Sequence, residues 1–472
     1  MKATLADAMQ LFMEGSIALA KAEAEGICID MPYLERVSKK VEAKIQSLQD
    51  ELKNDEVYKV WRRKFGLKTN LTSRFQLGEV LFKEMDLPYK GDFTKTGRFK
   101  TDETILTLVD IPFVKKLLQV EDLKRLKSNN LDGLKREVVH GFLHPFFNLA
   151  GGGEDDKGGA RSYRSSSAAI NFQALPNRDP ILRKIIRRCF IPRSPRNCLI
   201  EIDYAAHEFR IAACFWRDPE MVLYASDPTK DIHRDMAARC FAIPNEEVTK
   251  DLRYYGKNGF VFPRLYGSYY PQIARKMWIA VDQKGLKSTS GTPIKQILKE
   301  QGIAKLGACD PKKDPQKGTF EWHLKKVETN FDKQFSTFAK SREKWFKQYR
   351  ELGWFPMLTG FRIEGLYTKN AVMNYGIQGP AFHCLLWSLI RLQKWLTDNE
   401  FITKIIAQIH DCILLDGPAN EVKAVLKIAK KIMTQDIRKA WDWIIVPLDI
   451  EAQVTDPGCS WYEKKPMKIP DT

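Results

Sequence analysis

Residues 199–211 read Leu199-Ile-Glu-Ile-Asp203-Tyr204-Ala-Ala-His207-Glu208-Phe-Arg210-Ile211, and this stretch decides the fold that we expect. Its first four residues are apolar except Glu201, so they predict a short buried strand. After Asp203 the apolar residues recur at helical spacing. Asp203 therefore lies at the exit of a strand, where a rigid backbone can hold a carboxylate toward a metal ion. The alternative is an ordinary aspartate in a turn.

A second stretch, Ile405-Ile-Ala-Gln-Ile409-His410-Asp411-Cys412-Ile413-Leu414-Leu415, has the pattern of a hairpin. Two apolar runs meet at a polar His-Asp tip, which we expect to be exposed. Asp203 and Asp411 thus lie at the ends of two strands that are about two hundred residues apart in the sequence. Two such strands can build a site for two hard cations.

Length, charge and cysteine content narrow the class of protein. At 472 residues the chain exceeds a single core, so we expect several subdomains. A net charge of +17 favours a polyanionic partner, although a merely basic protein is the alternative. The nine cysteines have no close pairs or metal-ligand spacing, which indicates reduced thiols in a cytosol-like compartment. We find neither a membrane-spanning run nor a signal peptide, and therefore expect a soluble intracellular protein without a membrane partner.

A basic helix is predicted around Arg253 and Lys257, which are four residues apart and so share one helical face. Aromatic residues follow, including Phe262 and Tyr266. Cations for a triphosphate and aromatics for a base are typical of a nucleotide-binding helix. An amphipathic helix that happens to carry a lysine is the alternative. Pro263 lies within the same segment, which favours a kink or bulge.

Several other segments have local signals. Ser73 precedes an apolar-periodic helix with Gln76 in the capping-box position. The basic, hydroxyl-rich loop at residues 93–101 suits phosphodiester contacts. A glycine-rich linker follows at residues 151–159. Residues 281–325 are interpreted as an insertion with little core-building content; its lysines either bind template or a partner, or belong to a solvated loop.

The carboxy-terminal third is expected to return to sheet and helix. A short hairpin is predicted around residues 359–362. Residues 374–380 are expected to cap an apolar helix that runs from Ala381 to Leu396. A final strand pair is predicted from Val446 to Trp461.

Together these stretches resemble the polymerase region of family A DNA polymerases, the group of bacterial DNA polymerase I and many bacteriophage replicative enzymes. The resemblance covers nearly the whole chain, and its segments occur in the family's order. They are motif A (Asp203-Tyr204, Glu208, Arg210), motif B (Arg253, Lys257, Phe262, Tyr266-Gly267), motif C (His410-Asp411), the segment Arg164 to Asn171, Gln173 and Pro176, the segment Asn374 to Gln378-Gly379, and the thumb segments Asn70, Ser73, Gln76 and Lys95-Thr96-Gly97.

The resemblance implies an α+β, right-hand fold with an antiparallel palm sheet, helical fingers and a helical thumb. The expected division is an N-terminal helix and strand packing on the palm (1–30), the thumb (31–140), the first part of the palm with motif A (141–230), the fingers with motif B and the insertion at about 281–325 (231–365), and the second part of the palm with motif C (366–472).

The resemblance also implies a template-directed DNA polymerase that adds deoxynucleotides to a primer 3′-hydroxyl with two Mg²⁺ ions, for which Mn²⁺ can substitute. The implied metal ligands are Asp203, Asp411 and a carbonyl of Ile202 or Tyr204. Lys257 is the implied proton donor to pyrophosphate, and Arg253 the second catalytic cation. The implied deoxynucleotide-binding residues are Tyr204, Glu208, His233, Arg253, Lys257, Phe262 and Tyr266. The implied DNA-binding residues are Asn70, Ser73, Lys95, Thr96, Arg164, Asn171, Gln173, Asn374, Gln378 and His410.

Three departures from the family's pattern bear on this assignment. Cys412 stands where the family has glutamate, so the cation site would have two carboxylates. Lys257 and Phe262 are separated by five positions where the family has four, which leaves open whether Phe262 or Val261 faces the sugar. Asn370 replaces an expected arginine, so one duplex contact is in doubt.

Two other functions compete with the DNA polymerase. The first is a single-subunit RNA polymerase on the same palm; Glu208 argues against it, because an enzyme that accepts ribonucleotides needs a small residue there. The second is a degenerate polymerase that serves as a duplex-binding accessory subunit. The aspartates and the set Arg253, Lys257 and His233 are retained, which argues against loss of catalysis.

The resemblance raises further expectations about partners. Primer-template DNA and deoxynucleoside triphosphates are the expected ligands. Residues 1–30 are too few for the 3′–5′ exonuclease domain that many family members have before the thumb, so we expect none. A separate exonuclease or processivity subunit is a further expected partner. The expected setting is phage-type DNA replication in the cytosol of a bacterium or of a phage-infected host.

Overall fold

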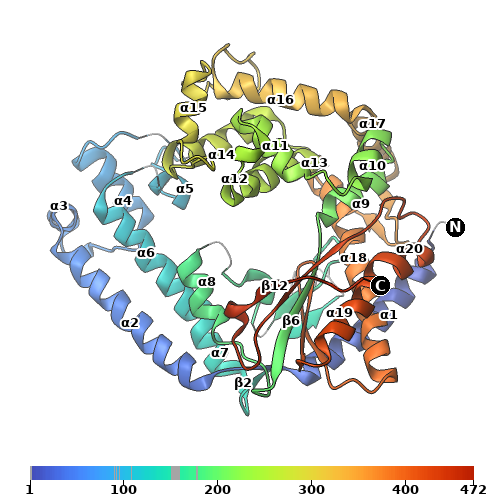
Figure 1. Ribbon diagram of the computed structural model, residues 1–472. Helices are drawn as coiled ribbons and strands as arrows, with labels where there is room; N and C mark the ends of the chain where they lie inside the picture. The colour runs from blue at the N-terminus through green and yellow to red at the C-terminus, as the bar shows by residue number, and fades with distance from the viewer. Residues whose placement is uncertain are drawn as a thin grey trace.

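The chain is described here by a computed structural model, in which residues 3–89, 91, 93–94, 96–107, 109–149, 160–168, 170–176 and 179–471 are placed. Two helical arms extend from a central sheet and leave an opening between them (Figure 1). One arm is built from residues 31–137 and the other from residues 232–352. The architecture is α+β, as the sequence predicts.

The central sheet has five antiparallel strands in the order β12-β11-β6-β10-β9. Its strands are β6 (Asn197–Tyr204), β9 (Lys404–Ile409), β10 (Cys412–Pro418), β11 (Ile450–Val454) and β12 (Lys465–Met467). Helices α1, α18 and α19 pack against these strands. The predicted strand at 199–202 is confirmed, and it is longer than predicted because the ladder continues through Asp203 and Tyr204. The hairpin predicted at residues 405–415 is also confirmed.

Helices surround this sheet and give it a buried apolar layer. They are α1 (Leu5–Glu25), α8 (Pro180–Arg187), α9 (His207–Trp216), α10 (Pro219–Ser226), α18 (Lys369–Asp398), α19 (Val422–Lys430), the π-turn η7 (Lys431–Asp436), α20 (Ile437–Ala440), and the 3-10 turns η4 (Phe172–Ala174) and η8 (Trp461–Glu463). Smaller antiparallel sheets lie beside them: β1 (Ile27–Cys28) with β3 (Phe142–Leu143) and β2 (Val138–Val139), β4 (Phe146–Asn148) with β5 (Ser166–Ala168), and β7 (Trp354–Pro356) with β8 (Arg362–Glu364).

The first arm is a long antiparallel helix pair with short helices at its tip. Its elements are α2 (Met31–Asn54), α3 (Glu56–Phe65), the 3-10 turn η1 (Gly66–Lys68), α4 (Arg74–Glu79), the π-turn η2 (Val80–Glu84), α5 (Glu103–Leu106), α6 (Pro112–Leu126), the π-turn η3 (Lys127–Leu131) and α7 (Asp132–Glu137). Helices α2 and α6 pack along each other through buried leucines and valines at helical spacing. The opposite faces are polar.

The second arm is a helical layer on the other side of the opening (Figure 1). Its elements are α11 (Ile232–Phe241), the 3-10 turn η5 (Asn245–Glu247), α12 (Lys250–Tyr255), the π-turn η6 (Gly256–Val261), α13 (Phe262–Leu265), α14 (Tyr270–Gln283), α15 (Ile294–Glu300), α16 (Phe320–Gln334) and α17 (Ser336–Leu352). Asp231 caps α11: its carboxylate accepts hydrogen bonds from the backbone N–H groups of His233 and Arg234 at 3.0 and 3.2 Å.

The start that the sequence predicts for the helix from Ala381 to Leu396 is wrong. The structure has one helix, α18, from Lys369 to Asp398 with Pro380 inside it. Thr368 caps this helix, and its first turns continue because apolar residues there are buried against neighbouring elements. The segment expected to be a cap is therefore helical, and Asn374 and Gln378 lie four residues apart on one face.

The insertion is also more ordered than expected. It contains α15, and its apolar residues Ile294, Leu298 and Phe320 are fully buried. Its lysines are exposed, and some pair with acidic neighbours, as Lys313 does with Asp310 at 3.9 Å. The expectation of little core-building content was wrong because a few spaced apolar residues suffice to anchor a short helix.

Among the described residues no helix is both long and apolar enough to cross a bilayer. All nine cysteines are described, and each is a free thiol.

Candidate active site

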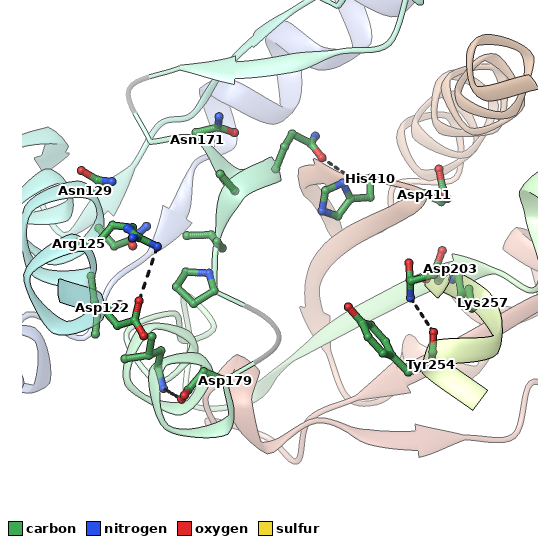
Figure 2. Close-up of a pocket in the computed structure, with 18 of the residues that line it drawn as sticks. Asp122, Arg125, Asn129, Asn171, Asp179, Asp203, Tyr254, Lys257, His410 and Asp411 are labelled. Carbon is green, nitrogen blue, oxygen red and sulfur yellow. Dashed lines mark hydrogen bonds and ion pairs between the residues drawn. The ribbon is translucent and has the colours of Figure 1, made fainter. Parts of the chain in front are cut away.

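Asp203 and Asp411 meet because two strands pair in register. Residues His410 and Asp411 form the two-residue turn between β9 and β10, and His410 has a left-handed φ of 51°. The residue after the turn, Cys412, pairs with Asp203 on β6. The turn therefore places Asp411 beside the strand end that carries Asp203, as Figure 2 shows.

Side chains from a distant segment hold this turn in place. Gln173 accepts a hydrogen bond at its Oε1 from the backbone N–H of His410 at 2.6 Å. Gln408 donates from Nε2 to the His410 carbonyl at 2.6 Å. Ser165 in turn donates to Gln408 Oε1 at 2.5 Å. Gln173 was expected to bind DNA, but its amide group is already engaged in positioning the His410–Asp411 turn.

The electrostatics of the two aspartates suit a cation. Burial and then the charge of Asp411 raise the pKa of Asp203 to about 7. One oxygen of each aspartate, Oδ1, is buried without a hydrogen-bond partner among the described residues. Within the same residues no group of three or more histidine, cysteine, aspartate or glutamate side chains could hold a metal ion. Two adjacent carboxylates, of which Asp203 has a raised pKa, and each with a buried oxygen that makes no hydrogen bond, fit a hard divalent cation.

Glu208 lies at the centre of a second polar cluster, on the first turn of α9. Tyr266 donates its hydroxyl hydrogen to Glu208 Oε2. Gln378 Nε2 donates to that same hydroxyl oxygen at 3.5 Å. Arg164 bridges the clusters, since its guanidinium is 3.7 Å from Glu208 and 3.6 Å from Asp411. Burial and the charge of Asp411 raise the pKa of Glu208.

The predicted nucleotide-binding helix is α12–η6–α13, and it is bulged as Pro263 indicated. Its middle is the π-turn Gly256–Val261, which takes up one residue more than an α-helical turn. The ring of Phe262 then lines the same cavity as Lys257, whose Nζ is 5.2 Å from the ring centroid. Val261 is fully buried. The structure thus brings Phe262, not Val261, to the cavity beside Lys257.

Arg253 projects from the same helix one turn earlier and also lines the cavity. Its Nε donates to Asp231 Oδ2 at 2.6 Å, which fixes the guanidinium at the cavity wall. His233 does not line the cavity, because it lies edge-on behind Phe262 and is 1% exposed. Burial, followed by the charges of Lys257 and Arg253, lowers the pKa of His233.

Tyr204 also points away from the cavity. Its ring stacks on His207 at a centroid distance of 4.1 Å, and its hydroxyl contacts Ser388 Oγ at 2.9 Å and donates to the Met433 carbonyl at 3.1 Å. The side chain is therefore a core residue. Only the backbone carbonyl remains available for the ligand role that the sequence suggested.

One cavity of 1420 Å³ joins these clusters to the first arm (Figure 2). It is lined on the sheet side by Arg164, Asn171, Gln173, Asp203, Glu208, Gln378, His410 and Asp411, on the second arm by Lys250, Arg253, Tyr254, Lys257, Asn258 and Phe262, and on the first arm by Glu103, Asp122, Arg125, Ser128, Asn129, Asn130 and Arg136, among others. The cavity is therefore a cleft between the two arms, with the aspartates on its floor.

The cleft-lining polar face of the first arm was not predicted from the sequence. Asp122, Arg125 and Asn129 recur at helical spacing along α6 and η3, and all three line the cleft. That spacing was the signal that could have identified them. Tyr254 and Asn258 on the second arm were also missed, although they flank Lys257.

The predicted thumb contacts lie elsewhere. Ser73 caps α4 by accepting from the backbone N–H of Gln76 at 3.3 Å. The reciprocal bond of a capping box is not made, because Gln76 Oε1 accepts from Trp61 and Asn70 at 2.9 Å each. Asn70 Oδ1 accepts hydrogen bonds from the backbone N–H and the hydroxyl of Thr72. These groups do not line the cleft.

Two more predicted DNA contacts can be located and one cannot. Thr96 is exposed, and its hydroxyl is 3.0 Å from that of Thr94. Lys95 lies outside the described residues. Asn374 lines a separate cavity of 400 Å³ behind Phe262 and Tyr266, next to Asn370.

The fold, with a sheet floor and two helical arms, is that of a right-hand polymerase. The chain belongs to DNA polymerase family A, whose model matches residues 31–288 and 325–463. The unmatched stretch between them, 289–324, falls within the insertion.

Three proteins to which the chain is similar illustrate its membership of the family. The thermostable DNA polymerase I of Thermus aquaticus is 28% identical over 457 residues, which cover 95% of this chain and 47% of that protein. DNA polymerase I of Lactococcus lactis subsp. cremoris is 28% identical over 450 residues, covering 95% and 45%. The POL domain of Pol1 from M. smegmatis, solved in complex with DNA primer-template and dNTP, has a TM-score of 0.72 at 24% identity and covers 96% of this chain and 70% of that one. The chain spans about half the length of the curated relatives it matches.

Proposed function

We propose that the chain is a template-directed DNA polymerase that adds deoxynucleotides to a primer 3′-hydroxyl with the help of two divalent cations. The observation that carries this proposal is the placement of Asp203 and Asp411 on the floor of a cleft whose wall presents Lys257 and Arg253. Membership of DNA polymerase family A supports the same reaction.

Asp203 and Asp411 would hold the cations, with a backbone carbonyl of Ile202 or Tyr204 as a further ligand. Mg²⁺ is the expected ion, and Mn²⁺ is expected to substitute for it. When bound, such ions activate the attacking hydroxyl and neutralise charge on the leaving oxygen. The Oδ1 atom of each aspartate is buried without a hydrogen bond, and Arg164 approaches that of Asp411 only to 3.6 Å, so a cation would supply the close partner that both atoms lack.

Lys257 and Arg253 would bind the triphosphate of the incoming nucleotide. Both project from one helix into the cleft, and the ion pair with Asp231 keeps Arg253 in a fixed orientation. Lys257 lies within electrostatic reach of Asp203, since its charge opposes the rise in the pKa of Asp203 that burial causes. It is therefore the group placed to give a proton to pyrophosphate as it leaves.

Phe262 and Glu208 would contact the sugar of the nucleotide and select deoxyribose. The Phe262 ring lies beside Lys257, where a deoxyribose would follow the triphosphate. Glu208 is held by the Tyr266 hydroxyl, so its carboxylate cannot move aside without breaking a buried hydrogen bond. A ribonucleotide would bring a 2′-hydroxyl against this pair. His233, behind Phe262, would support the ring without touching the nucleotide.

The duplex would lie in the cleft between the arms. Arg164, Gln378, His410 and Asn171 face it from the sheet side, where they could contact the minor groove near the primer end. The net charge of +17 favours this polyanionic ligand. The related POL domain was solved with DNA primer-template and dNTP, which supports the same pair of ligands for this chain.

The proposal extends to the division of the chain into subdomains and to its cellular setting. We assign the thumb to residues 31–140, the fingers to 231–365, and the palm to 141–230 and 366–472, in agreement with the two arms and the sheet. The nine free thiols favour the cytosol of a bacterium or of a phage-infected host. A role in phage replication and separate exonuclease or processivity subunits stay predictions.

Primer extension tests the proposal. The purified chain should extend a 5′-labelled primer by the nucleotide complementary to each of the four template bases, and EDTA should stop the reaction. Ribonucleotides should be poor substrates. Duplex binding without any extension in Mg²⁺ or Mn²⁺ would contradict the proposal and favour an accessory subunit.

A further inference from the structure

One side of Asp203 lacks the acidic neighbour that the family pattern has. Cys412 is the cross-strand partner of Asp203 on β10, so their side chains lie on the same face of the sheet. Cys412 is 6% exposed and contributes a thiol where a carboxylate would be expected. A buried thiol offers a divalent hard cation neither the oxygen nor the charge that it prefers.

The other side of Asp203 does have a carboxylate. Strand β11 pairs with β6 so that Glu451 is the second cross-strand partner of Asp203. Partners in an antiparallel ladder have Cβ atoms roughly 5 Å apart and point to the same face. Glu451 is exposed, and its charge is one of those that act on Asp203. Asp203 is thus flanked by Cys412 on one strand and Glu451 on the other.

Glu201, two residues before Asp203 on β6, is a further acidic side chain on this face, but it already has partners. It accepts a hydrogen bond from Trp461 Nε1 at 2.7 Å and forms a close ion pair with Lys464. Glu451, by contrast, makes no side-chain hydrogen bond or ion pair with any other residue that the structure describes. The charges of both glutamates act on Asp203, but of the two only Glu451 is not engaged by another described side chain.

We propose that Glu451 is a positioning residue of the cation site. It supplies the third carboxylate, which Cys412 does not, and it holds the water ligands of the cation at Asp203. The inference rests on the proposed function and deepens it. It assigns to β11 a role that motif C would otherwise fill. The carboxylate beside Asp203 thus lies on β11 and not on β10, at a separation that the sheet register fixes.

Mn²⁺ binding to the enzyme complex tests this inference independently of turnover. Free Mn²⁺ would be titrated by electron paramagnetic resonance in the complex of the full chain with a dideoxy-terminated primer-template and the next deoxynucleotide. Glu451→Gln should weaken Mn²⁺ binding roughly tenfold, as for other residues that support metal ligands indirectly. Glu451→Asp, which keeps the charge, should stay within about threefold of wild type.

Two further variants make the result specific. Asp456→Asn removes an exposed carboxylate just beyond β11 that pairs with Lys465 at 2.6 Å, and it should leave Mn²⁺ binding unchanged. Adding Cys412→Glu to Glu451→Gln should restore part of the lost affinity. Circular dichroism would confirm that each variant is folded; for Glu451→Gln this is expected, because Glu451 is exposed and the exchange is isosteric.

The outcomes separate the two proposals. Wild type that binds Mn²⁺ and extends primers, together with an unchanged affinity in Glu451→Gln, would overturn the inference and leave the proposed function intact. Equal weakening by Asp456→Asn would also overturn it, since the effect would then be one of general charge. Wild type that neither binds Mn²⁺ in the complex nor extends primers would refute the proposed function itself.

Discussion

The sheet half and the helix half of the candidate site depart from the family's pattern in different ways. On the sheet, the spacing of the motif around His410 and Asp411 is kept, but Cys412 replaces a glutamate. On the helix, Lys257 and Phe262 are kept, but one residue is added between them. A side chain has changed in the strands and the backbone has changed in the helix.

The difference reflects what each element tolerates. An extra residue in a strand would turn every following side chain to the other face of the sheet, so Asp411 would lose its place beside Asp203. A helix can confine an extra residue to one wide turn, and η6 does so while α12 and α13 stay regular. In a strand, a lost side chain can be replaced from a neighbouring strand, which is the role that we propose for Glu451.

The largest effect is expected on the helix, from Lys257→Met. The methionine keeps the volume but removes the charge that faces the triphosphate, so kcat/KM for deoxynucleotides should fall on the order of a thousandfold. Single-nucleotide incorporation under steady state measures this. Lys250→Met is the matched control, because Lys250 lines the same cleft at the start of the same helix; it should cost less than about threefold. Equal losses would mean that the bulged helix does not orient Lys257 specifically.

Glu208→Ala tests the polar cluster that connects the two halves. Removal of the carboxylate opens the space beside the sugar, so the preference for deoxynucleotides over ribonucleotides should drop on the order of a hundredfold. The measurement is the ratio of kcat/KM for the two nucleotides. Glu220→Ala, an exposed residue at the start of α10, should leave the ratio unchanged. An unchanged ratio in Glu208→Ala would assign the discrimination to another residue.

Phe262→Tyr tests whether the π-turn η6 brings Phe262, and not Val261, against the sugar of the nucleotide. If Phe262 faces the sugar, a tyrosine hydroxyl there can replace the missing 3′-hydroxyl of a chain terminator. Dideoxynucleotide incorporation relative to deoxynucleotide should then rise about tenfold, the equivalent of one hydrogen bond. Competition between the two nucleotides in primer extension measures the ratio. No change would indicate that the extra residue has turned Phe262 away during catalysis.

The smallest effect is expected from the insertion, which the family model leaves unmatched. Exchange of Lys312, Lys313 and Lys317 for glutamine should change the slope of log affinity against log salt by less than one, because these exposed lysines lie among acidic residues on a solvated surface. A titration of primer-template by fluorescence anisotropy measures the slope. A drop of two or more would show that the insertion binds DNA. Deletion of the whole insertion is less informative, since Phe320 and Leu298 are core residues.

Much of the site was predictable because its signals are local. The apolar run before Asp203, the hairpin pattern around Asp411 and the four-residue spacing of Arg253 and Lys257 each depend on neighbours in sequence. Pro263 likewise indicated the bulge in the same segment. The cap at Ser73 follows from side-chain chemistry within one turn.

The rest depends on contacts that no local pattern encodes. Gln173 resembles a DNA ligand in sequence, yet it holds the His410 turn 237 residues away. Gln76 has the spacing for a capping box but bonds to Trp61 instead. The expected start of α18 at Ala381 was wrong because proline is a weak helix stop when the turns before it are buried. The pairing of Glu451 with Asp203 follows only from the sheet order.

The central claim is that Asp203 and Asp411 together hold the cations for nucleotide transfer. Asp411→Asn tests it most directly, since it removes one negative charge with almost no change in shape. Single-turnover primer extension in Mg²⁺ should slow by at least on the order of a thousandfold. Primer-template affinity, measured in the same preparation, should be retained. Extension by Asp411→Asn at a rate near that of wild type would contradict the account.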